Sequence, residues 1–202
     1  MGRRREFEEA EILEKVKEAF WAHGYEGLSY PVLMKETGLH KASLYAAFGD
    51  KQNLYIQALR AYNEMEVSGA VQHLSEKNDM NGVERIQSLL TRVIDAVAID
   101  NDRRGCFLCN AAIEQAPLNL ATQKIVTAGL ERMKLGFLKA LNDDPTTKTL
   151  SPNTLEPMSS TITSVYFGMR VMAKSGVPIS MMKEARNGII DQIKAMSEKG
   201  TA

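Results

Sequence analysis

Two groups of residues in this chain have types and spacings that suit chemistry. The first is a pair of cysteines, Cys106 and Cys109, which lie three residues apart and directly follow Arg103, Arg104 and Gly105. At the first turn of a helix this spacing places both sulfurs on one face, and helix amides and nearby cations lower the pKa of a thiol. The pair is therefore a candidate sensor of oxidants or electrophiles. Buried thiols that pack as small apolar groups are the alternative, and the sequence leaves both open.

Metal and cofactor chemistry is not expected. A single C-x-x-C pair cannot supply the four ligands of a structural zinc site within one chain, and His23, His40 and His73 are not spaced as metal ligands. The sequence shows no motif for a nucleophile, a general base or a cofactor. We therefore expect no catalytic residues, no metal and no cofactor, and a protein that is not an enzyme.

The second group lies between Gly24 and Leu54, where the sequence predicts two short helices joined by a turn. Ser29 is a helix-start residue, Pro31 stands near the first helical position, and Gly38 ends the helix. After a short turn another helix follows. Two short helices with this connection are typical of the helix-turn-helix.

The second of these helices, from about Lys41 to Phe48, has two different faces. Leu44 and Phe48 lie four residues apart and form an apolar face for packing. Lys41 near the helix start and the small residues Ala42 and Ala46 leave the rest of the surface open. A helix of this kind suits insertion of its N-terminal end into a DNA major groove.

Many positions of this region follow one pattern. They are Gly24, Ser29, Leu33, Thr37, Gly38, Leu39, Ser43, Leu44, Tyr45, Phe48, Lys51 and Leu54. The pattern resembles the DNA-binding domain of the TetR family of transcriptional repressors. The resemblance is close over roughly the first quarter of the chain, and the remainder is similar to the family's all-helical C-terminal domain in length and layout. Departures from the family pattern occur at Met34, His40, Ala42 and Ala47.

The resemblance implies which residues contact DNA. Lys41 is expected to reach a base edge, guanine above all, with Ala42 and Ala46 against thymine methyl groups. Lys51 and the hydroxyl groups of this region are expected to hold phosphates, and His40 is either a neighbour of DNA or a plain solvent-facing cap residue. The full expected set is Ser29, Tyr30, His40, Lys41, Ala42, Ser43, Tyr45, Ala46 and Lys51.

Composition narrows the class of protein further. The chain has 202 residues, of which 44% are hydrophobic and 25% charged, and its formal net charge is zero. It has no uninterrupted apolar run long enough to span a bilayer and no apolar secretory segment near its start, so we expect a cytoplasmic protein with no membrane partner. Because phosphate contacts supply most of the affinity for DNA, a neutral chain depends on local cations and on a dimer.

The rest of the sequence reads as helix throughout. Apolar residues recur at intervals of three and four, without internal repeats or a strand pattern, which predicts an all-α fold of about nine helices. We expect a helix-turn-helix DNA-binding domain in residues 1–50 and a helical domain for ligand binding and dimerisation in residues 51–202. The segment 142–153 has the least regular pattern.

The last two predicted helices, about 155–175 and 179–197, each carry a wide apolar stripe. The resemblance implies that they pair with the same helices of a second chain in a four-helix bundle. A purely intramolecular core is the alternative. The expected dimer contacts are Ile162, Val165, Met169, Met172, Met182, Ile189 and Ile193.

The resemblance also implies a ligand cavity in the C-terminal domain. Its candidate walls are rich in methionine, which adapts well to an apolar guest but also fills ordinary cores, so pocket and core both stay open. No signature names the ligand. The candidate residues are Met65, Ile94, Val97, Phe107, Leu108, Met133, Phe137, Tyr166 and Met169.

These observations favour a homodimeric repressor that binds a palindromic operator on double-stranded DNA. A small-molecule inducer that enters the C-terminal domain would release it. The alternative is a regulator that senses oxidants or electrophiles through Cys106 and Cys109.

Overall fold

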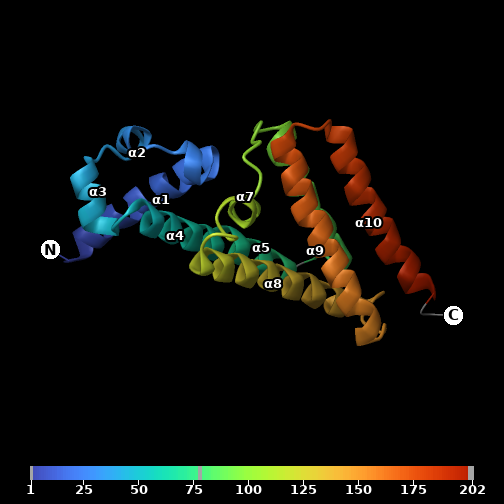
Figure 1. Cartoon of the computed structure of the whole chain (residues 1–202). Helices are drawn as coiled ribbons and strands as arrows, with labels where there is room; N and C mark the ends of the chain where they lie inside the picture. The colour runs from blue at the N-terminus through green and yellow to red at the C-terminus, as the bar shows by residue number, and fades with distance from the viewer. Residues whose placement is uncertain (1, 77–78, 200–202) are drawn as a thin grey trace. The chain divides into compact units, whose positions relative to one another are not determined.

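The computed structural model describes residues 2–76 and 79–199, with side chains from 9 to 198 across the same gap (Figure 1). In the described part of the chain the regular elements are helices and no strand occurs, so the predicted all-α class is confirmed. Residues 51–75 form two α-helices and a π-helix between them, which follow one another without a break. Counted as one, they leave nine continuous helical stretches in the described residues, as predicted.

The internal contacts divide the chain into two compact units. The first comprises the residues up to Glu66 together with Cys106–Thr127, and the second comprises Val67–Gly105 together with the residues from Ala128 onward. The described part of the predicted DNA-binding domain lies in the first unit. The boundary that we expect at residue 50 concerns function and stays a prediction.

The first unit is organised around α1. Its elements are α1 (Gly2–Gly27), α2 (Tyr30–Thr37), α3 (Lys41–Phe48), α4 (Lys51–Tyr62), most of the π-helix η1 (Asn63–Val67), α7 (Phe107–Glu114) and the start of α8 (Leu120–Asp143). Helix α1 packs on α2, α4 and α7, and α4 also packs on α3 and α7. The core between them is largely aromatic. Phe20 and Tyr55 meet edge to face at 5.1 Å between ring centroids, and Tyr55 meets Phe107 at 5.4 Å.

The π-helix η1 continues α4 into the next helix, α5. Its Met65 is exposed, and the Met65 sulfur accepts a hydrogen bond of 3.6 Å from Lys17 Nζ on α1. The Lys17 side chain is buried, and its ammonium also pairs with Glu14 at 2.6 Å. The π turn is therefore fixed to α1 by a buried cation within the first unit.

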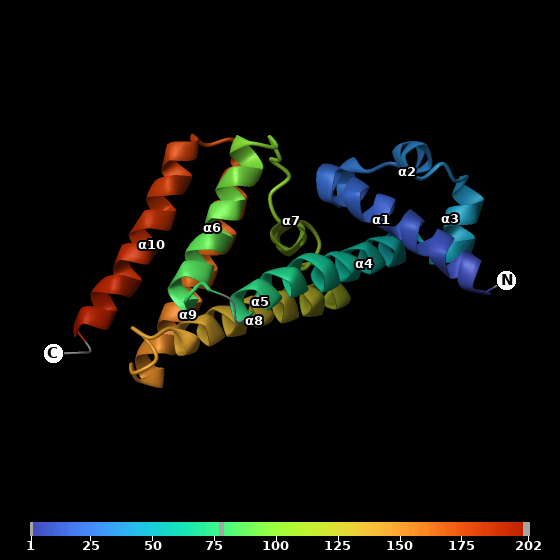
Figure 2. The same ribbon diagram turned by 180° about the vertical axis from the view of Figure 1, so that it is seen from behind.

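The second unit contains α5 (Ser68–Ser75), α6 (Gly82–Ala98), α9 (Pro152–Ser175), α10 (Ile179–Lys199) and most of α8. Helices α6, α9 and α10 pack pairwise on one another, and α5 packs on α6. Both views show α10 alongside this group (Figures 1 and 2). Helix α6 begins with a capping box, in which Asn81 and Glu84 each accept a hydrogen bond from the other's backbone N–H.

The segment that looked least regular in the sequence is ordered by Asp144, which is almost fully buried. Its carboxylate accepts hydrogen bonds from the backbone N–H of Val83, at 2.9 Å, and of Thr146, at 2.8 Å. Gly82, beside Val83, lies so close to α8 that a Cβ atom there would overlap the Ala140 carbonyl oxygen. One carboxylate therefore caps α6 and shapes the turn after α8.

None of the helices in the described residues combines the length and the apolar character that crossing a bilayer requires.

Candidate nucleic-acid interface

The turn between α2 and α3 is held by backbone geometry and one buried hydroxyl. Ser29 is the N-cap of α2 in extended conformation, and Gly38 ends the helix with a left-handed φ of 72°. The Thr37 hydroxyl donates to the Leu33 carbonyl at 2.6 Å and accepts from the Leu39 N–H at 3.3 Å. The helix start and stop predicted from Ser29 and Gly38 are both confirmed.

Helix α3 packs through the face that the sequence predicts. Leu44 is 1% exposed and Phe48 is 7% exposed. Gln57 of α4 donates from Nε2 to the Phe48 carbonyl at 3.0 Å, and Asp50 caps α4 by accepting from the Asn53 N–H at 2.8 Å. These contacts fix α3 on α4 and leave the remaining surface of α3 open.

Seven of the nine predicted DNA contacts are exposed, and none is buried. Ser29 and His40 are the N-caps of α2 and α3, and neither side chain makes a capping hydrogen bond. Tyr30 and Lys51 are half-buried. The residues that are exposed are Ser29, His40, Lys41, Ala42, Ser43, Tyr45 and Ala46.

Lys41 lies against a pair of stacked tyrosines. The rings of Tyr30 and Tyr45 are 5.3 Å apart and nearly parallel, and Lys41 Nζ is 4.4 Å from the Tyr30 centroid and 5.6 Å from the Tyr45 centroid. Burial and then the neighbouring Tyr45 hydroxyl raise the pKa of Tyr30 to about 12. Tyr30 is therefore neutral at ordinary pH and keeps its O–H as a donor. The sequence does not predict the contact of Lys41 with these rings, because the two tyrosines belong to different helices.

Lys51 has a similar aromatic support in the first unit. Its Nζ lies 4.6 Å from the centroid of the Tyr25 ring. The Tyr25 ring in turn meets the buried Tyr55 edge to face at 5.1 Å. Cation–π contacts at partly exposed sites contribute about 0.5–1 kcal/mol, so these rings restrict where the two ammonium groups lie.

The two thiols differ in their surroundings. Cys106 is the N-cap of α7, as its predicted place at the helix start requires, and its sulfur is buried and accepts a hydrogen bond from the Tyr62 hydroxyl at 3.5 Å. Cys109 is half-buried. The Arg104 guanidinium pairs with Asp102, and this hydrogen bond lowers the pKa of the Asp102 carboxyl. Reactivity of either thiol stays a prediction.

The predicted pocket residues are distributed over both units. In the second unit Phe137 and Tyr166 contact each other edge to face at 5.8 Å. Met65 in the first unit is exposed on η1, where its sulfur contacts Lys17. The others are buried, namely Ile94, Val97, Phe107, Leu108, Met133, Phe137, Tyr166 and Met169. Whether any of them lines a ligand cavity stays a prediction.

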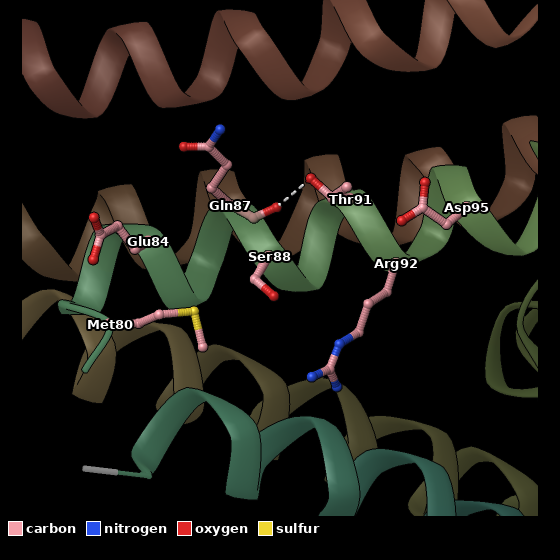
Figure 3. Close-up of a pocket in the computed structure, with 7 residues that line it drawn as sticks. All are labelled: Met80, Glu84, Gln87, Ser88, Thr91, Arg92 and Asp95. Atoms are coloured by element: carbon pink, nitrogen blue, oxygen red, sulfur yellow. Dashed lines mark hydrogen bonds between the residues drawn. The ribbon is translucent and has the colours of Figure 1, made fainter. Parts of the chain in front are cut away.

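A hollow of about 500 Å³ lies along the outer surface of α6 and shares none of the predicted pocket residues (Figure 3). Seven residues line it, and all but Met80 are polar or charged. They are Met80, Glu84, Gln87, Ser88, Thr91, Arg92 and Asp95. At its margin Arg92 donates to His73 Nδ1 at 3.1 Å, and Arg186 of α10 donates to the Thr91 hydroxyl at 3.2 Å.

The expected dimer contacts stay a prediction, and the structure shows where they lie within one chain. Most of them face the interior of the same chain, because packing among α6, α9 and α10 covers the apolar stripes. Val165 and Met172 keep partial exposure. The buried ones are Ile162, Met169, Met182, Ile189 and Ile193. Contact of these five side chains with a second chain would therefore require a change in the packing of α6, α9 and α10.

Among the described residues, no group of three or more His, Cys, Asp or Glu side chains is placed to hold a metal ion.

Comparison with known proteins finds one family that the helix-turn-helix region matches. Residues 12–58, which include α2, α3 and most of α4, match the family of bacterial regulatory proteins called the tetR family. The chain is 31% identical over 117 residues to the HTH-type transcriptional regulator YezE of Bacillus subtilis, and 26% identical over 117 residues to the HTH-type transcriptional repressor ComR of Escherichia coli. These matches cover 58% and 57% of this chain, but only 59% and 55% of the two relatives.

Solved structures with the same fold cover nearly the whole chain. The TetR family regulator CifR, a cysteine mutant in complex with 26-base-pair double-strand operator DNA, superposes with a TM-score of 0.75 at 25% identity, over 89% of this chain and 93% of that one. A TetR regulator from Chloroflexus aurantiacus superposes with a TM-score of 0.80 at 18% identity, over 95% and 96% of the two chains. Residues 12–58 thus match the tetR family of bacterial regulatory proteins, and the chain has the fold of solved TetR family regulators. Because proteins of this family are regulators and not enzymes, the prediction that the chain is not an enzyme is confirmed.

Proposed function

We propose that this chain is a repressor that binds a palindromic operator on double-stranded DNA as a homodimer, through α2, α3 and the first turn of α4. The observation that carries the proposal is the open face of the helix-turn-helix. There every residue predicted to contact DNA is exposed or half-buried, while Leu44 and Phe48 anchor the opposite face. The operator complex of CifR and the repressor names of the relatives support it.

Two lysines in this face have different proposed roles, and substitutions separate them. Lys41→Ala is expected to weaken the preferred site by about 1–3 kcal/mol and to relax base preference at one position of each half-site. Lys51→Ala is expected to weaken all sequences alike and to lower the salt dependence of binding. Affinities of both variants for a selected duplex and for a scrambled one provide the measurement. Parent-like binding by both variants would remove α3 as the recognition helix.

The dimer contact that we propose lies on the outward faces of α9 and α10. Val171 and Met181 are about half exposed there, at 46% and 47%, and space is open in front of Gly168 and Gly188. Small residues allow close approach of helices, and exposed apolar side chains gain from being covered. This face replaces the five buried side chains as the surface that a second chain meets.

Sedimentation velocity tests the dimer. Val171→Glu and Met181→Glu are expected to shift the chain toward monomer, because each would place a carboxylate inside the interface. Leu135→Glu is the matched control, since Leu135 on α8 is 61% exposed and lies outside the proposed contact. A parent protein that sediments as a monomer at micromolar concentration would contradict the dimer.

Release by a small-molecule inducer is part of the proposal and is supported by the family resemblance alone. The alternative trigger is modification of Cys106 or Cys109. The burial of Cys106 and its hydrogen bond from Tyr62 favour a structural thiol. Alkylation of the native protein distinguishes the two, because a sensor thiol reacts faster than free cysteine at neutral pH and releases DNA. Cys106→Ser and Cys109→Ser should leave DNA binding unchanged if both thiols are structural.

A further inference from the structure

The end of α1 is joined to α7 by one carboxylate within the first unit. Gly24 interrupts α1 with a φ of 73°, and the next residue, Tyr25, donates its backbone N–H to Glu114 Oε2 at 3.0 Å. Glu114 is the last residue of α7 and lies 89 positions further along the chain. It packs so closely that a Cβ atom on Gly24 would stand 2.6 Å from Glu114 Oε1. A side chain at position 24 would therefore displace the Glu114 carboxylate.

Tyr25 connects this corner to the surface that faces DNA. Its ring lies under the Lys51 ammonium at 4.6 Å and against the Tyr55 ring at 5.1 Å. A backbone hydrogen bond fixes the position of Tyr25, and the Tyr25 ring in turn restricts the position of Lys51. Glu114 and Lys51 thus contact the same residue, Tyr25. Glu114 binds its backbone N–H, and Lys51 lies over its ring.

The same carboxylate acts on a second tyrosine. Tyr55 is fully buried, and its hydroxyl has no hydrogen-bond partner in the structure. Burial first, and then the negative charge of Glu114, raise the pKa of Tyr55 well above its usual range. Glu114 therefore holds Tyr25 by a hydrogen bond and acts on Tyr55 through its charge.

We infer that Glu114 is a positioning residue for DNA binding, which acts from α7 by fixing Tyr25 and, through the Tyr25 ring, the ammonium of Lys51. The inference rests on the proposed function, in which Lys51 neutralises a phosphate. It adds a residue outside the helix-turn-helix, at the end of α7, to the residues that determine affinity.

The test measures affinity as a function of salt, for a duplex that the parent protein selects from a random-sequence library. The slope of log affinity against log salt counts the phosphates neutralised, so losing one phosphate contact lowers the slope by about 1 per bound chain. Glu114→Ala is expected to weaken binding and lower the slope as Lys51→Ala does. The double variant is expected to bind no more weakly than Lys51→Ala alone.

Two controls separate positioning from charge and from folding. Glu131→Ala, at an exposed site on α8, removes the same charge, and it is expected to leave binding unchanged or to strengthen it. Glu114→Gln keeps an oxygen that accepts from the Tyr25 N–H and is expected to retain the parent slope. If Glu114→Ala does not fold, Tyr25→Leu is expected to lower the slope, and Tyr25→Phe is expected to preserve it.

The outcomes distinguish the two proposals. A parent protein that selects no duplex overturns the proposed function and this inference with it. If Lys51→Ala lowers the slope while Glu114→Ala and Tyr25→Leu bind like the parent, DNA binding stands and the positioning role is wrong. Additive losses in the double variant would likewise contradict it.

Discussion

Two aspartates cap helices in this protein, and they do so in opposite ways. Asp50 accepts from the N–H of Asn53, three residues ahead, in an exposed hydrogen bond at the start of α4. Asp144 accepts from the N–H of Val83, 61 residues earlier, in a buried hydrogen bond at the start of α6. The first cap is local and faces water, whereas the second joins the start of α6 to the end of α8. The start of α4 therefore relies on a local signal, whereas the start of α6 also relies on a contact between distant segments.

The largest effect is expected where α6 meets α8. Gly82→Ala would drive a Cβ atom into the Ala140 carbonyl oxygen, so one helix must move, and we expect a loss of about 3 kcal/mol or more in the free energy of unfolding. Gly69→Ala on α5 is the control, because its site is open, and it is expected to stabilise by up to about 1 kcal/mol. Urea unfolding measures both. Equal effects of the two substitutions would refute the tight junction.

Asp144→Ala is expected to cost about 2–3 kcal/mol of unfolding free energy, because it leaves the buried N–H of Val83 without a partner. Asp144→Asn keeps one acceptor oxygen and is expected to lose less. Thermal unfolding of both variants provides the measurement. If Asp144→Ala lost less unfolding free energy than Asp50→Ala, water would be replacing the Asp144 carboxylate at the Val83 N–H.

Asp50→Ala is expected to cost only about 1 kcal/mol, the usual value for an exposed N-cap. Asp50→Ser keeps an acceptor and should recover most of it. The same unfolding measurements give the difference in unfolding free energy between the Asp50 and Asp144 variants. A larger loss at Asp50 than at Asp144 would reverse it.

The smallest effect is a dependence of stability on pH. His73 is buried in the second unit between the Arg85 carbonyl, 3.2 Å from Nε2, and the Arg92 guanidinium, 3.1 Å from Nδ1. Burial first, and then the charge of Arg92, lower the pKa of His73 below its ordinary value of 6.5. The unfolded chain therefore binds a proton that the folded chain resists, so stability is full above about pH 6.5 and falls as pH drops toward the folded pKa.

Replacing the ring tests that dependence. His73→Gln is expected to flatten the unfolding free energy between neutral and mildly acid pH, relative to the parent. His40→Gln, at an exposed site, is the control and should leave the pH profile as it is. A parent profile that is already flat over this range would exclude the effect.

How much the sequence predicts follows the same division between local and distant contacts. Ser29 and Gly38 each act within a few residues, so the two ends of α2 are predicted correctly. The stacking of Tyr30 on Tyr45 depends on how two helices meet, and spacing alone gives no sign of it. The Glu114 contact with Tyr25 joins distant segments and was also beyond sequence reasoning.

The apolar stripes of the last two helices show a different limit. Their period predicts correctly that α9 and α10 each have an apolar face. It does not say whether that face meets the same chain or another one. Met169, Met182 and Ile193 are large and apolar, as residues of a dimer contact often are. In this chain α6, α9 and α10 pack together and bury them completely. The choice between interior and interface depends on a third helix, which periodicity does not reveal.

The π-helical turn Asn63–Val67 has a consequence for insertions and deletions within the family. Losing one residue inside an ordinary α-helix turns every later side chain by about 100° and scrambles its faces. A π turn holds one residue more than the α-helical turn that would replace it, so a deletion there converts one into the other and the change stays local. In sequence alignments, a gap of one residue at this point therefore belongs inside the helix, and relatives with and without it can keep the same helix faces.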